Sequence, residues 1–334
     1  AKQLRHVSFL SRARMARIAN RQGLKEDQLE TYNFRDRSLL DLVDERIQSQ
    51  EQVCFLNEHF RSRPGIIRFS NREFYANTLR IMTERPDTLV DPSVQIWHIE
   101  SMRKGKGPNK EEADALLGEL EQWLEREKGF KKEHFHSLGI LSPFRDQVEY
   151  PPKEIGRRFS LGLLDRHRLL VGTAHTFQGE ERDIMLLSTV VDPTSHPGSF
   201  RFLNRPDVFN VSITRARQRQ IIFTSLPASP GGGNLIDRYL ADSQEGLPRR
   251  QLSKAHVRFL AEVCQALEAE GFTTWPNYLA AGMNIDLLVE HNRRSLGIDL
   301  VGYPGHLAKA FSMESYRMFR RAGLHLFPLP WSTW

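Results

Sequence analysis

The sequence has few cysteines and no long apolar run. Its 334 residues include two cysteines, Cys54 and Cys264, which lie far apart in apolar patterns. We expect two buried free thiols in a reducing compartment rather than a disulfide. No apolar run approaches the roughly 18 residues that a membrane-spanning helix requires, and no secretory signal is visible. These absences predict a cytoplasmic protein without membrane contact.

The sequence also lacks a phosphate-binding loop of the form Gly-x-x-x-x-Gly-Lys-Ser/Thr. The basic stretch 104–107 contains glycines and lysines, but it has neither a preceding strand nor the required spacing. Leu42–Glu45 superficially resembles a strand end that binds Mg²⁺, yet its apolar spacing favours a solvated helix. The printed chain therefore contains no site at which we expect ATP to be hydrolysed without another domain.

Charge and length bound the partners and the domain number. The chain has 47 basic and 41 acidic residues, a net charge of +6, which favours a polyanionic partner, although the charges are spread along the chain. A length of 334 residues suits two domains. Residues 227–234 and 244–250 have linker composition, and Ser253 can cap a new helix. We place the domains at 1–247 and 248–334.

The first domain alternates short apolar runs with helical patterns. This alternation implies an α/β fold, a parallel sheet with helices on both faces. One helix is expected to begin at Pro64, one after Asn109, and one over Asp207–Arg217. The expected strands are Val53–Leu56, Gln95–Ile99, Leu138–Leu141, Leu169–Val171, Ile184–Leu187 and Gln220–Thr224.

A polar loop, residues 175–183, lies between two of these strands. Loops rich in donors and acceptors at strand ends are where α/β proteins place ligand chemistry. An ordinary surface loop has a similar composition, so composition alone leaves both interpretations open.

Four stretches resemble motifs of superfamily 1 helicases, the group that includes the nonsense-mediated-decay helicases. They occur in the expected order: HFRSRPGI at 59–66 (motif IV), LSPFRDQV at 141–148, TAHTFQGEERD at 173–183 (motif V) and FNVSITRAR at 209–217 (motif VI). Gln3-Leu4 resembles the end of motif III, so we expect the chain to begin in mid-protein. The resemblance implies the second RecA-like domain of a P-loop NTPase-type helicase.

The resemblance also implies roles for single residues. Arg215 would be the arginine finger for the γ-phosphate of ATP, and Arg61 would contact phosphate oxygens from the same side of the cleft. In the alternative, Arg61 forms a surface ion pair and Arg215 is a surface charge. ATP with Mg²⁺ would be shared with an N-terminal RecA-like domain of the same protein. The implied nucleotide-binding residues are Gln3, Arg61, Gln178, Gly179, Glu181 (near the ribose) and Arg215. The residues implied to face nucleic acid are Ser142, Phe144, Thr173, His175 and Thr176.

The second domain contains a predicted hairpin. Gly282–Glu290 and Ser295–Val301 have strand patterns separated by a four-residue turn. If Glu290 faces Ser295, Asp286 faces Asp299 with Cβ atoms roughly 5 Å apart. Two such carboxylates repel unless a cation or a proton lies between them, and Mg²⁺ or Mn²⁺ fits. In the alternative, the register slips and one aspartate faces solvent.

This region resembles the PD-(D/E)XK nuclease fold in its very-short-patch-repair or restriction-endonuclease-like form. The resemblance implies that Asp286 and Asp299 are catalytic metal ligands and that Glu262 is an additional ligand. The chain has Val301 where the family often has a lysine, so activity is open; His306 is a candidate substitute.

The leading hypothesis is the C-terminal part of an ATP-dependent DNA helicase with an appended, metal-dependent nuclease domain, acting in DNA repair. Its partner would be single-stranded DNA or a duplex with a single-stranded tail. One alternative is a DNA endonuclease whose helicase-like part only docks DNA, and another is a non-catalytic DNA-binding module.

Overall fold

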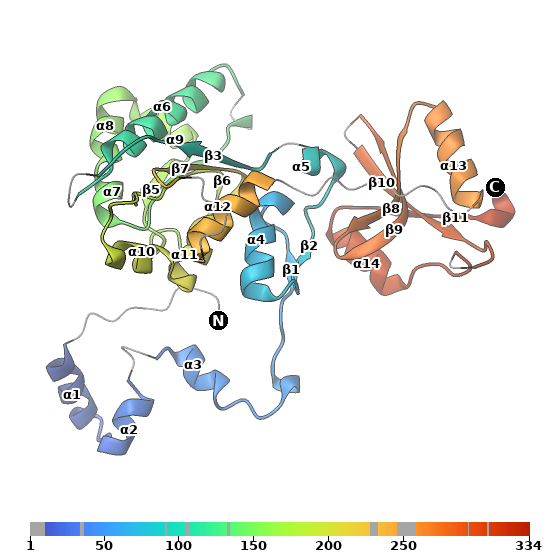
Figure 1. Cartoon of the computed structure of the whole chain (residues 1–334). Helices are drawn as coiled ribbons and strands as arrows, with labels where there is room; N and C mark the ends of the chain where they lie inside the picture. Colours follow the sequence, from blue (N-terminus) through green and yellow to red (C-terminus); the bar gives the residue numbers. More distant parts are fainter. Residues whose placement is uncertain are drawn as a thin grey trace.

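The computed structural model describes residues 11–33, 37–90, 92–103, 107–131, 134–227, 233–245, 258–292, 294–305 and 307–334. Two separate main sheets lie on either side of the predicted boundary at 247/248 (Figure 1), and that boundary itself lies outside the described residues. No helix in these ranges is long and apolar enough to cross a membrane.

The first sheet has five parallel strands in the order β3-β7-β6-β4-β5. It confirms the predicted α/β fold with a parallel sheet and helices on both faces. The strands are β3 (Val94–His98), β4 (Leu138–Leu141), β5 (Leu170–Gly172), β6 (Arg182–Ser188) and β7 (Ala216–Thr224).

The alternation of side chains along β6 explains why helices cover both faces. Ile184 and Leu186 pack against α6, whereas Met185 and Leu187 pack in the cluster formed with α4 and α11. On the first face lie α6 (Lys110–Arg126), α8 (Pro151–Arg158) and α9 (Leu161–Arg166); α7 (Arg145–Glu149) precedes α8. On the second face lie α4 (Pro64–Tyr75), α10 (Pro197–Leu203), α11 (Pro206–Ile213) and α12 (Leu235–Glu245).

Three predictions about local structure are wrong: the strand at Val53–Leu56, the burial of Cys54, and the end of the helix at Arg217. The expected strand Val53–Leu56 is irregular, and Cys54 is exposed while Cys264 is buried; both thiols are free. The strand there is β1 (Glu58–His59), which pairs in parallel with β2 (Arg80–Ile81). The helix expected over 207–217 ends at Ile213, because the backbone from 215 onward joins the sheet: the Arg182 amide donates to the Arg215 carbonyl.

The remaining elements of the first 90 residues are short. Figure 1 shows α1 (Arg12–Arg21), α2 (Glu26–Thr31) and α3 (Leu39–Asp44) set apart from both main sheets. A 3₁₀ turn, η1 (Gln50–Gln52), precedes β1, and α5 (Pro86–Val90) follows β2.

The second sheet has four strands in the order β11-β10-β9-β8. Helices α13 and α14 pack on its opposite faces, because Leu287 and Val289 contact α13 whereas Leu288 contacts α14. The elements are α13 (Arg258–Ala269), β8 (Thr273–Ala280), β9 (Met283–His291), β10 (Arg294–Val301), α14 (Met313–Arg321), β11 (Leu326–Pro330) and the 3₁₀ turn η3 (Trp331–Thr333). The predicted hairpin register is confirmed: Ser295 pairs with Glu290 and Ile298 with Leu287.

A buried carboxyl joins three elements of the first sheet. Glu112 of α6 is fully buried and accepts hydrogen bonds from the Ser188 hydroxyl (2.6 Å) and the Ser225 hydroxyl (2.8 Å). It also accepts from the backbone amide of Val190 (2.9 Å) and the side-chain amide of Asn109 (3.3 Å). Burial nevertheless raises the pKa of Glu112 to about 7, because removing a charge from water favours the neutral form.

Glu112→Gln should flatten the pH dependence of stability. The folded pKa lies above the unfolded value, so the stability from the protonated group is fully present below pH 4.5 and is lost as pH rises through 7. Between pH 5 and 8 the wild type should lose on the order of 2 kcal/mol that the variant does not lose. Urea unfolding at both pH values measures this difference. Glu121→Gln, an exposed change on the same helix, should keep the wild-type slope; equal slopes in Glu112→Gln and wild type would disprove the assignment.

Candidate nucleotide site and nucleic-acid groove

A cavity of about 740 Å³ lies where β1, α4, α11 and the loop before β6 meet. It brings together Arg61, Gln178, Gly179, Glu181 and Arg215, which the sequence assigned to nucleotide binding from separate motifs. Its other lining residues are Leu56, Glu58, His59, Phe60, Ile67, Tyr75, Leu79, Asn210, Val211, Thr214 and Arg217. Gln3, the remaining predicted nucleotide-binding residue, lies outside the described residues.

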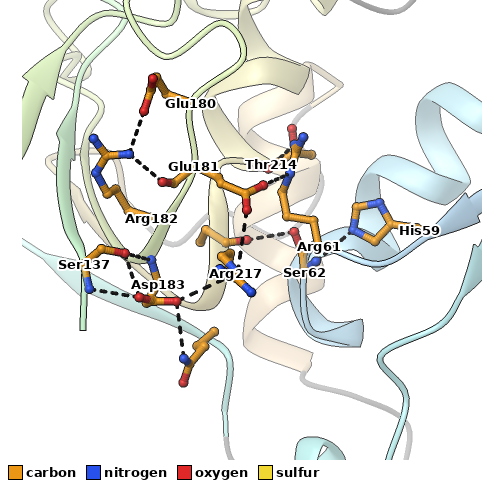
Figure 2. Close-up of polar contacts among 12 residues, drawn as sticks. His59, Arg61, Ser62, Ser137, Glu180, Glu181, Arg182, Asp183, Thr214 and Arg217 are labelled. Atoms are coloured by element: carbon orange, nitrogen blue, oxygen red, sulfur yellow. Dashed lines mark hydrogen bonds and ion pairs between the residues drawn. The ribbon is translucent and has the colours of Figure 1, made fainter. Parts of the chain in front are cut away.

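Arg61 is positioned by the turn that follows β1. Its Nε donates to Glu181 Oε2 at 2.7 Å and its Nη1 to the Thr214 carbonyl at 3.3 Å (Figure 2). The next residue ties the turn to the sheet, because the Ser62 hydroxyl donates to the Ala216 carbonyl at 2.7 Å. The Arg61 guanidinium is therefore held at the cavity wall by Glu181 and by the Thr214 carbonyl, and its backbone is held by the bond from Ser62 to the sheet.

Glu181 lies between two arginines. Besides Arg61, Arg217 Nε lies 3.7 Å from Glu181 Oε1, and Arg217 also lies 3.9 Å from Asp183 (Figure 2). Asp183 in turn accepts from the Ser137 amide (2.9 Å) and hydroxyl (2.6 Å), which keeps it directed toward β4. Arg61 therefore does form an ion pair, with Glu181, and both residues line the cavity.

Arg215 lies in the short link between α11 and β7. Its guanidinium donates to the carbonyls of Val211 (3.1 Å) and Phe177 (3.3 Å) and to the Thr214 hydroxyl (3.3 Å). Within the described residues it makes no ion pair with a carboxylate. Burial and the charge of Arg61 lower its pKa to about 10, so it stays protonated at neutral pH.

His59 is a neutral member of the same wall. Its Nε2 accepts the Ser62 amide at 3.0 Å, which leaves the proton on Nδ1. Burial, with the charges of Arg61 and Arg215, lowers its pKa to about 4. The cavity is therefore cationic through its arginines alone at neutral pH.

Gln178 and Gly179 belong to a compact loop between β5 and β6. Phe177, fully buried, fixes the loop to the core, and Gly179 has φ of +90°, a conformation that favours glycine. Phe60 also lines the cavity, although the sequence analysis did not predict it to bind nucleotide. It is 51% exposed at the cavity wall, and the only signal for it was its place directly before Arg61.

A second hollow, about 1670 Å³, lies beside this loop and contains four of the five residues predicted to face nucleic acid: Phe144, Thr173, His175 and Thr176. The fifth, Ser142, is 1% exposed, and its hydroxyl accepts from the Phe144 amide at 3.2 Å. Ser142 shapes the turn after β4 and does not line the hollow.

The second hollow also contains residues that motif comparison missed. The Phe144 and Phe202 rings have centroids 5.5 Å apart, and Arg103, Arg145 and Arg205 supply positive charge. The segment containing α10, with two phenylalanines and two arginines between residues 200 and 205, carried the only sequence signal.

In the second sheet the two predicted aspartates lie together. The paired register ends at Ile298 and Leu287, directly before the aspartates, and the hydrogen bond from the Leu300 amide places Asp286 next to the segment that contains Asp299. Asp286 Oδ2 accepts the Leu300 amide (3.0 Å), and Asp299 Oδ2 accepts the Phe311 amide (2.9 Å) and the Tyr316 hydroxyl (2.7 Å). Asp299 Oδ1 is buried without a hydrogen-bond partner among the described residues. Burial, together with the hydrogen bond to Asp299 and the negative charge of Asp299, raises the pKa of Tyr316.

Glu262 does not join this pair, which corrects the predicted ligand set. It lies on α13, the helix that packs against Leu287 and Leu300, whereas Asp299 contacts Tyr316 of α14 on the other face. Glu262 instead pairs with Arg258 at 2.8 Å. The described residues contain no group of three or more His, Cys, Asp or Glu that could hold a metal ion. His306 lies outside the described residues.

The AAA domain family matches residues 35–226, more than half of the chain and the whole of the cavity described above. The chain belongs to this family. The match ends before residue 248, so the nuclease resemblance of the second sheet stays a prediction.

Helicases are among the relatives of this AAA-domain chain. Helicase sen1 of Schizosaccharomyces pombe is 26% identical over 236 residues, covering 64% of this chain and 13% of that protein. DNA polymerase alpha-associated DNA helicase A of Saccharomyces cerevisiae is 23% identical over 235 residues, with coverages of 63% and 33%. The Regulator of nonsense transcripts 1 homolog of Arabidopsis thaliana is 28% identical over 224 residues, with coverages of 61% and 17%. The resemblance to superfamily 1 helicases is confirmed for this domain. The chain spans at most a third of these relatives.

His59→Gln should remove a stability loss at acid pH. The folded pKa lies below the unfolded value of 6.5, so the neutral ring contributes stability above pH 6.5 that is lost as pH falls toward 4. Between pH 6.5 and 4.5 the wild type should lose on the order of 2 kcal/mol at this site. Urea unfolding at both pH values tests this. His134→Gln, an exposed substitution, is the matched control and should behave as wild type; an unchanged slope in His59→Gln would contradict the burial argument.

Proposed function

We propose that residues 1–247 form the second RecA-like domain of an ATP-dependent superfamily 1 nucleic-acid helicase. The observation that carries the proposal is the excess of positive charge in the cavity. The lining has three arginines, Arg61, Arg215 and Arg217, and two glutamates, Glu58 and Glu181. Glu181 is the acidic partner of Arg61 and Arg217, whereas Glu58 is paired with Arg321, which is not a lining residue. Arg215 has carbonyls in place of a carboxylate. A polyphosphate supplies the missing negative charge.

In this proposal the arginines act on the phosphates from one side of a cleft. Arg215 would stabilise the charge that develops on the γ-phosphate, and Arg61 would contact the same phosphate group. Glu181 and Gln178 would bind the ribose side, and the exposed face of Phe60 would pack against the base. The phosphate loop and the Mg²⁺ ligands would come from another RecA-like domain of the protein, since the printed sequence contains no such loop.

The second hollow would hold single-stranded nucleic acid. Phe144 and Phe202 offer rings on which bases can stack, and the three arginines offer phosphate contacts. Thr173, His175 and Thr176 line the hollow and belong to the same loop between β5 and β6 as Gln178, which lines both spaces. Nucleotide-dependent movement of this loop would therefore change the grip on the strand. We propose DNA as the substrate because of the nuclease resemblance of residues 248–334.

Arg215→Ala in the full-length protein should reduce DNA-stimulated ATP turnover by roughly a thousandfold or more, as expected for loss of an arginine finger. DNA binding should change little, because Arg215 does not line the second hollow. Turnover and fluorescence anisotropy with labelled single-stranded DNA measure the two effects. Arg166→Ala, an exposed change on α9, is the control. Unchanged turnover in Arg215→Ala, or turnover by the 334-residue chain alone, would sink the proposal.

A second candidate function is metal-dependent DNA cleavage by residues 248–334. The observation that favours it is the pair Asp286 and Asp299, with Asp299 Oδ1 buried and lacking a partner among the described residues. Two carboxylates fit Mg²⁺, which usually keeps several waters and uses one or two carboxylates with substrate phosphates. The bound cation would polarise the scissile phosphate. Val301 in place of lysine leaves the activation of water to another group.

The nuclease proposal predicts cleavage of single-stranded or duplex DNA by the chain in Mg²⁺ or Mn²⁺. Asp286→Ala and Asp299→Ala should each abolish it, and Glu270→Ala, an exposed acidic residue at the end of α13, should leave it intact. Product analysis on denaturing gels is the measurement. DNA binding without cleavage in the wild type would instead favour a non-catalytic DNA-binding unit.

A further inference from the structure

The strand β1, which forms part of the cavity wall, is also in contact with the second sheet's helix α14. Glu58 and His59 of β1 both line the cavity. Glu58 pairs with Arg80 and His59 with Ile81 in the parallel ribbon β1–β2, and the Met82 amide donates to the His59 carbonyl at 2.9 Å. One side of this ribbon thus lies at the cavity.

The other side of the ribbon is bound to residues 258–334. Arg321 of α14 donates to both carboxylate oxygens of Glu58, with its Nε at 2.9 Å from Oε2. Met82 is 2% exposed because it packs in the core that includes Phe319. The Arg85 guanidinium donates to the Ala322 carbonyl. An ion pair, an apolar contact and a hydrogen bond from a side chain to a carbonyl therefore join the ribbon and the residues directly after it to the end of α14.

These contacts bear directly on Arg61. The turn that contains Arg61 is fixed to β7 on its far side, through Ser62 to Ala216 and through the Arg63 amide to the Arg217 carbonyl at 2.9 Å. On its near side the turn follows β1, whose Glu58 accepts from Arg321, and the Thr83 hydroxyl donates to the Ser62 carbonyl at 2.6 Å. The guanidinium of Arg61 lies between these two attachments.

We propose that Arg321 is a positioning residue for the nucleotide cleft: by holding Glu58 in a two-bonded ion pair, it fixes β1 and thereby the placement of Arg61. The inference rests on the proposed ATP site and deepens it. It assigns residues 258–334 a role in ATP binding that is independent of any nuclease activity. Binding events on the second unit and on the cleft would affect each other reciprocally.

The effect should be moderate. Arg321 is half exposed and Glu58 is 22% exposed, so solvent screens part of the attraction. The two parallel hydrogen bonds add geometric restraint that a single-point contact lacks. The same pairing lowers the pKa of Glu58, with hydrogen bonding to Arg321 the largest cause. The pair therefore persists through the neutral range.

The test compares Arg321→Ala with Arg320→Ala in the full-length protein. Arg320 is exposed on the same helix turn and makes no described side-chain contact, so its loss matches the change in charge and helix propensity. Arg321→Ala should raise the KM for ATP roughly three- to tenfold and leave kcat within about twofold, because Arg215 is not moved. Arg321→Lys should restore part of the affinity through its single ammonium. The KM for ATP of the double variant Glu58→Ala/Arg321→Ala should be close to that of Glu58→Ala, since both residues act through one contact. The two values should differ by no more than the change in KM that Arg320→Ala causes.

Hydrogen exchange of the amides between residues 57 and 61, in the same variants, supplies a readout that does not need turnover. Faster exchange in Arg321→Ala than in Arg320→Ala, together with the KM rise, supports the inference. Equal behaviour of the two variants overturns it, and so does faster exchange with an unchanged KM. If the wild-type protein hydrolyses no ATP, the proposed function fails, and the exchange comparison alone decides whether Arg321 orders β1.

Discussion

The arrangement of arginines in the cavity of the first domain depends on one carboxylate, that of Glu181. Glu181 lies 2.7 Å from Arg61 and 3.7 Å from Arg217, and it allows two guanidinium groups to share a cavity with a third at Arg215. Without that negative charge the arginines would repel one another across a partly desolvated space. With it, the cavity still carries an excess of positive charge, so it is arranged for an anionic ligand. Burial is the main cause of the lowered pKa values of Arg215 and His59, and the neighbouring cations lower them further.

Such an arrangement requires a rigid frame, and the parallel sheet provides it. Arg61, Glu181 and Arg215 come from three motifs that are up to about 150 residues apart in the chain, as the bond from Arg61 to Thr214 illustrates. Buried side chains alternate along β6 toward helices on each face, so the strand cannot slip by one residue without exposing its core side chains. Glu112 adds a polar tie between α6 and the ends of β6 and β7.

The second sheet contributes in two separable ways. Its aspartate pair is a candidate for metal chemistry, whereas the end of α14 is in contact with the cavity wall through Glu58. The two features use different residues, so one can be lost without the other. If the proposed nuclease activity were absent, the proposed effect of α14 on the cleft would still stand, because it depends on Arg321 and Glu58.

The sequence by itself determined the elements whose signals are local. Alternating apolar runs defined the parallel strands, Pro64 and Asn109 marked helix starts, and the spacing around residue 291 set the hairpin register that places Asp286 beside Asp299. Motif order identified Arg61, Glu181 and Arg215 before any geometry was known. The strands, helix starts and hairpin register follow from side-chain periodicity and from backbone preferences of neighbouring residues, whereas Arg61, Glu181 and Arg215 were predicted from the resemblance alone.

Only the tertiary structure decided which residues meet. It ended α11 at Ile213 because sheet pairing outcompeted helix propensity, it buried Ser142 under the turn after β4, and it placed Glu262 on the face opposite Asp299. It also brought Arg321 to Glu58, 263 residues earlier in the chain. Long-range contacts of this kind depend on how complete sheets and helices pack, and no local pattern of residues encodes that packing.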